Sequence, residues 1–408
     1  MGTMASSTHQ FGVLDLIRAG LQDLDTARTL LDELRADGID DDRLCLLMKT
    51  LEQTCEPDIA LRNLVDIIKA LQSQGRDFHQ VITDDAGLVR LVTVLGVSDE
   101  MGKLMRFRPE LVMAAASDSC ESHLYNHAQR RAHVLEAVGA DPADNRMPKA
   151  TKPLAEAATA LRQTYRKQLA AIMAQDATAA TVSGALDATA HDPIEIQPRI
   201  SQELSDLADA ALEGALAIAR NEVDGSEHVR FAIIGMGKLG ARELNYVSDV
   251  DLIYVVEPAD KDTNGMTLNR VGTKMATTLQ RVCQSVIMGV AEPTLWQIDG
   301  GLRPEGKDGP LVRKLESHEA YYEQWAENWE FQALLKARPV AGDPDLGQAY
   351  MDMTRPFVWA ASKRDNFVYD CQQMRKRVED LIPAPLKDRE IKLGRGGLRD
   401  VEFTVQML

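Results

Sequence analysis

Apolar residues recur every three to four positions through the first part of the chain, from about residue 11 to residue 115. The segments LLDELRADG, DRLCLLMKTLEQ and ALRNLVDIIKALQ each show this spacing, and Gly, Asp or Pro residues separate them. Because an α-helix turns once every 3.6 residues, the spacing predicts a series of amphipathic helices. A helical scaffold or docking surface is the preferred interpretation of this region.

The pattern changes between residues 229 and 257, where short apolar runs replace the helical spacing. The first run, residues 231–234, leads into a glycine turn that contains Gly235, Gly237, Lys238 and Gly240. The second run, residues 252–256, follows a Ser-Asp-Val-Asp segment. Short apolar runs bounded by glycine and polar residues are typical of buried strands. The stretch therefore predicts a strand, a glycine turn, a short helix and a second strand.

Helical spacing returns on both sides of this stretch. Residues 142–153 have the composition of a linker or exposed loop, and the Ala-rich residues 154–221 predict helices, one starting near Ser201. The basic residues of this region are expected on a helix surface with paired charges; they are Arg162, Arg166 and Lys167. Further on, we expect a helix at about residues 268–288, a strand at about 295–298, and helix again from Glu316.

Charge and cysteine content exclude several classes of protein. The 408 residues carry a net charge of −16, which argues against a nucleic-acid binder, because such a protein needs a basic face. Five scattered cysteines, Cys120 among them, predict reduced thiols in a cytoplasmic protein. No apolar run approaches the ~20 residues of a membrane span. His123, His127 and His133 favour a solvated helix face over a zinc site, because no adjoining acid or Cys completes a site.

The glycine turn has two competing interpretations. In a dinucleotide fold, the G-x-G-x-x-G motif follows a strand, and Glu257, about 20 residues further on, binds a ribose. In a nucleotidyltransferase, the same turn lets the backbone approach a phosphate, with Lys238 or Ser248 contacting it. The glycines alone do not separate these interpretations.

Three carboxylates favour the second interpretation. Asp249 and Asp251 open a predicted strand at positions i and i+2, so their side chains point to the same face. Two carboxylates this close repel unless a cation lies between them, and Mg²⁺ prefers oxygen ligands. We expect the third predicted strand to carry Asp299 towards them, although Asp before Gly300-Gly301 is also typical of a turn cap. Together the three acids predict a two-metal site for phosphoryl or nucleotidyl transfer.

With these residues in view, the segment GMGKLGARELNYVSDVDLIYVVE resembles the signature of the glutamine synthetase adenylyltransferases, the bifunctional adenylyltransferase/adenylyl-removing enzymes. Residues 302–312, 321–343 and 392–406 are similar to the same family. The Ser-Asp-x-Asp version behind a long helical region resembles the N-terminal, adenylyl-removing half. The expected fold is α+β: a predominantly helical chain around a small mixed-sheet nucleotidyltransferase core of the polymerase-β-like type.

The expected domains are an N-terminal helical region, residues 1–150, a catalytic core with leading helices, 151–315, and a C-terminal helical subdomain with a second glycine turn, 316–408. The chain ends inside an apparent helix, and the resemblance implies a second catalytic half that this chain lacks.

The resemblance implies phosphorolysis, in which orthophosphate attacks the AMP phosphorus of an adenylylated tyrosine on glutamine synthetase and gives ADP. Asp249, Asp251 and Asp299 would hold two Mg²⁺, and Arg303 is the candidate for the attacking phosphate. A PII-type signal protein is an implied partner. The alternatives are adenylylation of glutamine synthetase from ATP by the same site, and an NAD-dependent oxidoreductase that uses the glycine turn.

Two departures from the family pattern bear on phosphate binding. Family members often carry Arg where Gly301 and Phe331 stand here, so more of this role is expected to fall on Arg303, Lys336 and Arg338. The second glycine turn, IKLGRGGLRD, either presents Lys392, Arg395 and Arg399 to a phosphate or is a tight strand-to-helix turn. Four aromatic residues at helical spacing favour packing over base stacking; they are Tyr321, Tyr322, Trp325 and Trp329.

Overall fold

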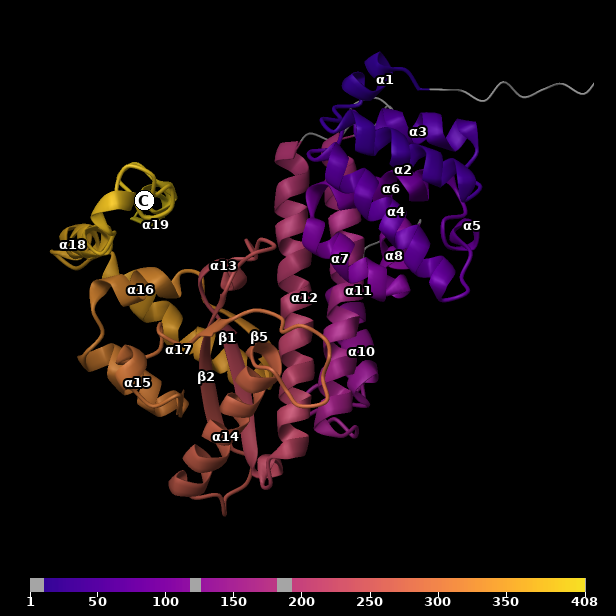
Figure 1. The fold of residues 1–408 in the computed structure, drawn as a ribbon. Coiled ribbons are helices and arrows are strands. Elements are labelled where there is room, and N and C mark those ends of the chain that lie inside the picture. Colours follow the sequence, from indigo (N-terminus) through magenta and orange to yellow (C-terminus); the bar gives the residue numbers. More distant parts are fainter. Residues whose placement is uncertain (1–10, 118–125, 182–192, 408) are drawn as a thin grey trace, which may run out of the picture. The chain divides into compact units, whose positions relative to one another are not determined.

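The computed structural model describes residues 11–117, 126–181 and 193–407, so Cys120 and His123 lie outside the described residues. Most of the described residues are helical, and a five-stranded sheet lies among them (Figure 1). This confirms the predicted α+β fold class. No helix among the described residues is long and apolar enough to cross a membrane.

Contacts divide the chain into two compact units, residues 1–126 with 163–207, and residues 127–162 with 208–408. Two long helices, α11 (Leu154–Thr181) and α12 (Pro193–Glu222), contribute to both units. The predicted domain boundaries at 150/151 and 315/316 stay predictions, because units that share helices do not define linear boundaries.

The first unit consists of helices, and the predicted amphipathic helices are confirmed. They are α1 (Val13–Arg18), α2 (Leu24–Ala36), α3 (Asp41–Leu51), α4 (Pro57–Ser73), α5 (Phe78–Val81), α6 (Asp85–Val97), α7 (Asp99–Phe107) and α8 (Pro109–Ala116). The side chains of Asp23, Asp40 and Asp84 accept backbone N–H bonds at three helix starts, which explains why the chain breaks there. The apolar faces share one core with Ala170 and Met173 of α11.

The predicted helix start at Ser201 is wrong. Ser201 lies inside α12 and is buried, and its carbonyl accepts the hydroxyl of Ser205 at 2.8 Å. The Ser-Glu pattern resembles a cap, but the apolar spacing continues through it. The helix instead begins at Pro193, a residue that suits the first helical turn.

The second unit contains the sheet and its helices. Its helices are α10 (His127–Val138), α13 (Gly237–Gly240), α14 (Gly265–Gln284), α15 (Leu315–Gln324), α16 (Asn328–Leu334), α17 (Pro344–Ala361), α18 (Phe367–Asp380) and α19 (Leu398–Met407). Its strands are β1 (Val229–Gly235), β2 (Val250–Pro258), β3 (Ile298–Asp299), β4 (Val312–Arg313) and β5 (Arg338–Gly342). The two predicted strands are confirmed, and the glycine turn itself forms the short helix α13 between them.

The sheet is mixed, as predicted. Its order is β3-β2-β1-β5, with β4 also paired to β2. Strands β1 and β2 are antiparallel, whereas β3 and β4 both run parallel to β2 along the same edge. Sequence reasoning missed β4 and β5, because β4 has two residues and β5 begins Arg-Pro, which is a poor strand signal.

Alternate residues of the strands point to opposite faces of the sheet. Ile253 and Val255 of β2 share a core with Tyr322, Phe331 and residues of α17 and α18. On the other face Tyr254 packs against Phe231 and accepts a hydrogen bond from Gln280 of α14 at 3.4 Å. The helices therefore cover both faces, and the strand ends near Gly235 and Asp251 are left for a site.

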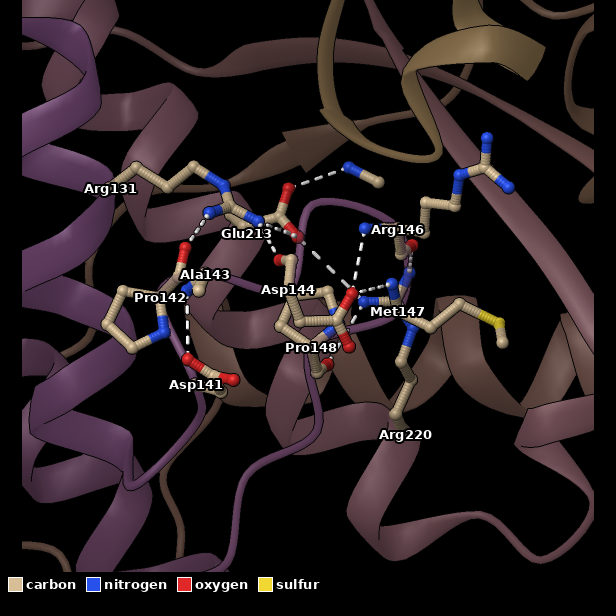
Figure 2. A network of polar contacts seen from close by, with 11 residues as sticks. Arg131, Asp141, Pro142, Ala143, Asp144, Arg146, Met147, Pro148, Glu213 and Arg220 are labelled. Carbon is tan, nitrogen blue, oxygen red and sulfur yellow. Dashed lines mark hydrogen bonds and ion pairs between the residues drawn. The ribbon is translucent and has the colours of Figure 1, made fainter.

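The predicted linker at residues 142–153 is a loop, but buried and half-buried side chains anchor it (Figure 2). Arg131 of α10 donates to the carbonyls of Pro142 and Asp144 at 2.9 and 2.6 Å. Arg220 of α12 donates to the carbonyl of Pro148 at 3.1 Å. Glu213 of α12 lies 3.8 Å from both guanidinium groups.

The expectation that Arg162 lies on a helix surface is wrong, because this side chain is buried. Its guanidinium donates to the carbonyls of Val282, Ser285 and Glu292 at 2.7–3.3 Å. Val282 lies in the last turn of α14 and Ser285 caps that helix, so these carbonyls lack intrahelical partners and accept from the guanidinium instead. Arg162 therefore fixes the chain between α14 and β3.

Candidate active site

The glycine turn after β1 lies against the acidic end of β2. The N–H of Met236 donates to the carbonyl of Asp251 at 2.8 Å. Gly237 has a φ of +53°, and a Cβ on it would lie 2.5 Å from Oδ2 of Asp251. A Cβ on Gly240 would overlap the carbonyl oxygen of Lys336. Gly237 therefore lets the turn approach the carboxylate of Asp251. Gly240 lets it approach the backbone of Lys336, just before β5.

Arg338 at the start of β5 holds this turn in place. Its guanidinium donates to both carboxylate oxygens of Asp209 on α12, at 2.5 and 3.0 Å. It also donates to the carbonyls of Leu239 and Gly240, at 3.0 and 3.2 Å. Because Asp209 is fully buried, this bidentate pair is a strong anchor. The arginine expected to share phosphate binding thus orients the turn.

The same carboxylate has a second neighbour, because Nε2 of His127 lies 3.5 Å from Oδ2 of Asp209. Sequence reasoning found no adjoining acid that would complete a site at this histidine. The acid is 82 residues away in sequence, so no local pattern predicts the contact.

The three predicted acids are neighbours in the structure. Asp251 and Asp299 are register partners on the parallel strands β2 and β3, and Asp249 directly precedes β2. Burial, with the charges of Asp249 and Asp299, raises the pKa of Asp251 to about 6. Among the described residues, however, the oxygens of these three acids do not all lie within 4.8 Å of one another.

Asp299 also has the structural role that the sequence left open. Its Oδ1 accepts the N–H of Gly301 at 2.7 Å, so it caps the turn after β3. A Cβ on Gly301 would lie 2.9 Å from that oxygen, which explains the glycine there. Asp299 thus combines a turn cap with a place beside Asp251.

A cavity of about 390 Å³ opens beside the acids. It is lined by Gly237, Lys238, Glu243, Ser248, Asp249, Asp251, Lys336, Lys392, Leu398, Arg399, Val401, Glu402, Val405 and Gln406. Five of the predicted site residues are in this set, namely Gly237, Lys238, Ser248, Asp249 and Asp251. The other four predicted site residues do not line this cavity; they are Gly235, Gly240, Asp299 and Arg303.

The cavity places cations opposite the acids. Lys392 and Arg399 come from the second glycine turn and α19, and both lower the pKa of Asp251 against the effect of burial. Lys336 donates to Glu243 and Glu402 at 2.8 and 2.7 Å. Burial lowers the pKa of Lys336, but these two ion pairs outweigh burial and raise it. The site therefore combines clustered acids, of which Asp251 and Asp299 are half-buried and Asp249 is exposed, with positive charge held by ion pairs.

Arg303 does not line this cavity. Its guanidinium donates to the carbonyls of Gly300, Lys307 and Gly309 at 2.7–3.2 Å, which closes the loop between β3 and β4. The predicted phosphate contact of Arg303 gains no support from this geometry. Among the described cavity residues, the cations are Lys238, Lys336, Lys392 and Arg399. Sequence reasoning gave Lys336 only a share of the phosphate binding expected of Arg303.

The dinucleotide interpretation of the glycine turn is wrong. That fold needs two parallel strands joined by a crossover helix, whereas β1 and β2 are antiparallel neighbours joined by residues 236–249, which include only the four-residue helix α13. Glu257, the expected ribose ligand, accepts the N–H of Leu315 at the start of α15 at 2.9 Å. The G-x-G-x-x-G spacing was a weak signal because it does not report strand direction.

A small mixed sheet with an Asp-x-Asp strand beside a glycine turn defines the class of nucleotidyltransferase-like domains. A family described as "Glutamate-ammonia ligase adenylyltransferase" matches residues 88–353. The chain belongs to this family. Residues 372–408, which include α19, match a second family described as "GlnD PII-uridylyltransferase".

Curated relatives share this similarity along nearly the whole chain. A protein of Bifidobacterium longum (strain DJO10A) is 74% identical over 405 residues, which are 99% of this chain and 37% of the relative. Proteins of Cutibacterium acnes and Streptomyces coelicolor are 41% and 40% identical over 97% and 96% of this chain. All three are named "Bifunctional glutamine synthetase adenylyltransferase/adenylyl-removing enzyme". The chain spans a little over a third of their length.

Proposed function

We propose that this chain removes AMP from an adenylylated tyrosine of glutamine synthetase by phosphorolysis. The observation that carries the proposal is Asp251, a half-buried acid whose pKa is raised to about 6 and whose neighbours are two more acids. Acids held together in this way beside a glycine turn and several cations are suited to transfer of a nucleotidyl group.

The reaction exchanges one oxygen on phosphorus for another. An oxygen of HPO₄²⁻ forms a bond to the AMP phosphorus while the bond from that phosphorus to the tyrosine oxygen breaks. The electron pair leaves with the tyrosine oxygen, which takes the proton of the attacking phosphate. The products are ADP and the unmodified tyrosine. No separate base is required, so catalysis rests on positioning and on charge neutralisation.

The three acids fit a divalent cation. Asp249, Asp251 and Asp299 offer the hard oxygen ligands that Mg²⁺ prefers, and burial together with the charges of the other two acids raises the pKa of Asp251. When bound, Mg²⁺ ions neutralise charge on the reacting oxygens. We propose two ions. A shared set of ligands requires a side-chain rotation of Asp249 or Asp299, since the present positions are not a closed set.

Other residues of the cavity have proposed roles in binding. Gly237 lets the backbone approach a phosphate, and Lys238 and Ser248 contact it from the same turn. We assign the attacking phosphate to Lys336 and Arg399 rather than Arg303, because these two line the cavity and Arg303 does not.

The direction of the reaction rests on the type of half that the sequence resembles. The relatives' names include both adenylyltransferase and adenylyl-removing activities, and this chain corresponds to a little over a third of their length. A PII-type signal protein as partner is supported by the second family match. The free thiols of the four described cysteines support the proposed cytoplasmic location.

One assay tests the proposal. The chain is incubated with adenylylated glutamine synthetase, Mg²⁺ and orthophosphate, and ADP release is followed, with EDTA as the control. We expect ADP release that requires both phosphate and Mg²⁺. Incorporation of AMP from ATP into the unmodified protein, with no ADP release, would overturn the proposed direction and support adenylylation. Absence of both reactions would overturn the proposed function itself.

A further inference from the structure

Two further cavities continue from the acid cavity through shared wall residues. The first, of about 220 Å³, shares Gly237, Asp251, Lys336 and Arg399 with the acid cavity. The second, of about 540 Å³, shares Trp329 and Met374 with the first. It has no wall residue in common with the acid cavity among the described residues. The three cavities therefore lie in series, with the smallest in the middle.

The middle cavity has mainly apolar walls away from the acids. Leu302, Trp329, Met374, Val378 and Phe403 line it, together with Asp251 at the end nearest the reaction. Its volume is below the ~300–1,000 Å³ of typical small-molecule pockets, so it suits a single ring rather than a nucleoside. A ring in this cavity would have one end at Asp251 and aromatic or sulfur-containing walls around its faces.

The outer cavity is polar and its walls are fixed by hydrogen bonds. Asn328 donates to Asp370 at 2.7 Å and accepts from Arg364 at 3.1 Å. Nε1 of Trp329 donates to Glu327 at 2.8 Å, which fixes the indole where the two cavities meet. Arg377, on the exposed side of α18, has no ion-pair partner among the described residues. Donors and acceptors of this kind suit a polypeptide backbone and its polar side chains.

We propose that the outer cavity between α16 and α18 receives the polypeptide segment that carries the modified tyrosine. The tyrosine ring then passes Trp329 and Met374 and occupies the middle cavity. This inference rests on the proposed function. A tyrosine bonded directly to the AMP phosphorus needs its ring next to the acids, whereas adenine is separated from that phosphorus by the ribose. The order of the cavities matches this requirement, because the acid cavity would hold the nucleotide, the middle cavity the tyrosine ring and the outer cavity the polypeptide.

The test compares two substrates and two charge reversals. The substrates are adenylylated glutamine synthetase and a small adenylylated tyrosine with blocked termini and no flanking residues. The variants are Arg377→Glu and, as a matched control, Arg270→Glu on the exposed face of α14, which lines none of these cavities. We expect Arg377→Glu to raise KM for the protein substrate roughly ten-fold, with kcat little changed, and to leave kcat/KM for the small substrate unchanged.

Equal KM values for the protein substrate in the two variants would overturn the docking proposal, as would equal losses on both substrates in Arg377→Glu. If the unchanged chain releases no ADP from either substrate, the proposed function fails instead.

Trp329→Ala tests the ring position separately. We expect roughly ten-fold lower kcat/KM on both substrates, with recovery in Trp329→Phe, because a second aromatic ring restores the wall. Full activity of Trp329→Ala would exclude the middle cavity as the ring site.

Discussion

The two walls of the acid cavity are built in different ways. The wall formed by the sheet carries Asp249 and Asp251, and the strand register and the buried pair of Arg338 with Asp209 hold it. The wall formed by α19 carries Arg399 and Glu402, and none of the helix's residues is buried. Side-chain contacts attach it, among them Lys336 with Glu402 at 2.7 Å and Gln332 with Gln406 at 2.8 Å.

The two kinds of attachment suit different functions of the two walls. Carboxylates that share cations need fixed spacing, which a strand ladder supplies through its backbone. Basic side chains that neutralise a mobile phosphate need reach rather than fixed spacing, and a helix attached by half-exposed ion pairs allows adjustment. We therefore expect changes in the sheet wall to cost more than changes in the helical wall.

The largest expected effect is on catalysis by Asp251→Asn. We expect ADP release to fall on the order of 10³-fold or more, because the variant removes a charge that the proposed Mg²⁺ site requires. Asp249→Asn should behave similarly. Activity within ten-fold of the unchanged chain would contradict the proposed role of these acids.

The second effect is on stability. Arg338→Met leaves the carboxylate of Asp209 buried without its bidentate partner, and we expect a loss of about 3 kcal/mol in the free energy of unfolding. Arg399→Met in the helical wall should cost less than about 1 kcal/mol, because its pair with Glu402 is partly exposed. Urea denaturation of both variants measures the two losses in the free energy of unfolding. Equal losses would contradict the expected difference between the two walls.

The third effect concerns pH. In the metal-free protein, Asp251 titrates at about 6, whereas an unfolded Asp titrates near its ordinary value of 3.8. Between these values the folded state binds the extra proton, so this group makes stability fall as pH rises from about 4 to 6. Above pH 6 the penalty is complete, at about 3 kcal/mol. Asp251→Asn has no carboxyl group to ionise and so lacks this penalty. The free energy of unfolding of the variant, minus that of the unchanged chain, should therefore increase between about pH 4 and pH 6.

The smallest effect is expected at Lys336. Lys336→Met should raise KM for orthophosphate about ten-fold, with a stability loss near 1 kcal/mol, because Arg399 still pairs with Glu402 at 3.1 Å. Lys336→Arg keeps the charge and serves as the matched control. An unchanged KM in Lys336→Met would move the phosphate to Lys392 or Lys238.

The sheet wall was predictable from sequence, and the helical wall was only partly so. Apolar runs, a glycine turn and Asp-x-Asp spacing are local patterns, so they predicted β1, β2 and the carboxylates on β2. The contribution of Lys336 depends on Glu243 and Glu402, which are 93 and 66 residues away. For the turn at Lys392 the sequence allowed two interpretations, phosphate binding and a tight turn. Only tertiary contacts bring this turn to the cavity.

Arg303 shows the limit of residue type. Because a guanidinium pairs bidentately with phosphate, the sequence predicted a phosphate contact, which stays a prediction, whereas in the structure three backbone carbonyls of an irregular loop accept from this guanidinium. The sequence gives the residue type, but the backbone carbonyls that accept from Arg303 come together only in the folded loop. β5 was missed for a related reason, because its pairing with β1 defines it more than its own residues do.

The anchored loop of Figure 2 sets a practical limit on shortening this chain. A version beginning at residue 151 would delete Arg131 and the carbonyls of Arg146 and Pro148, and the buried guanidinium of Arg220 would then face Glu213 without them. Glu213 also accepts the N–H of Gly342 at 2.7 Å, at the end of β5, so the damage would extend to the sheet. An expression design that isolates the nucleotidyltransferase sheet should start no later than His127.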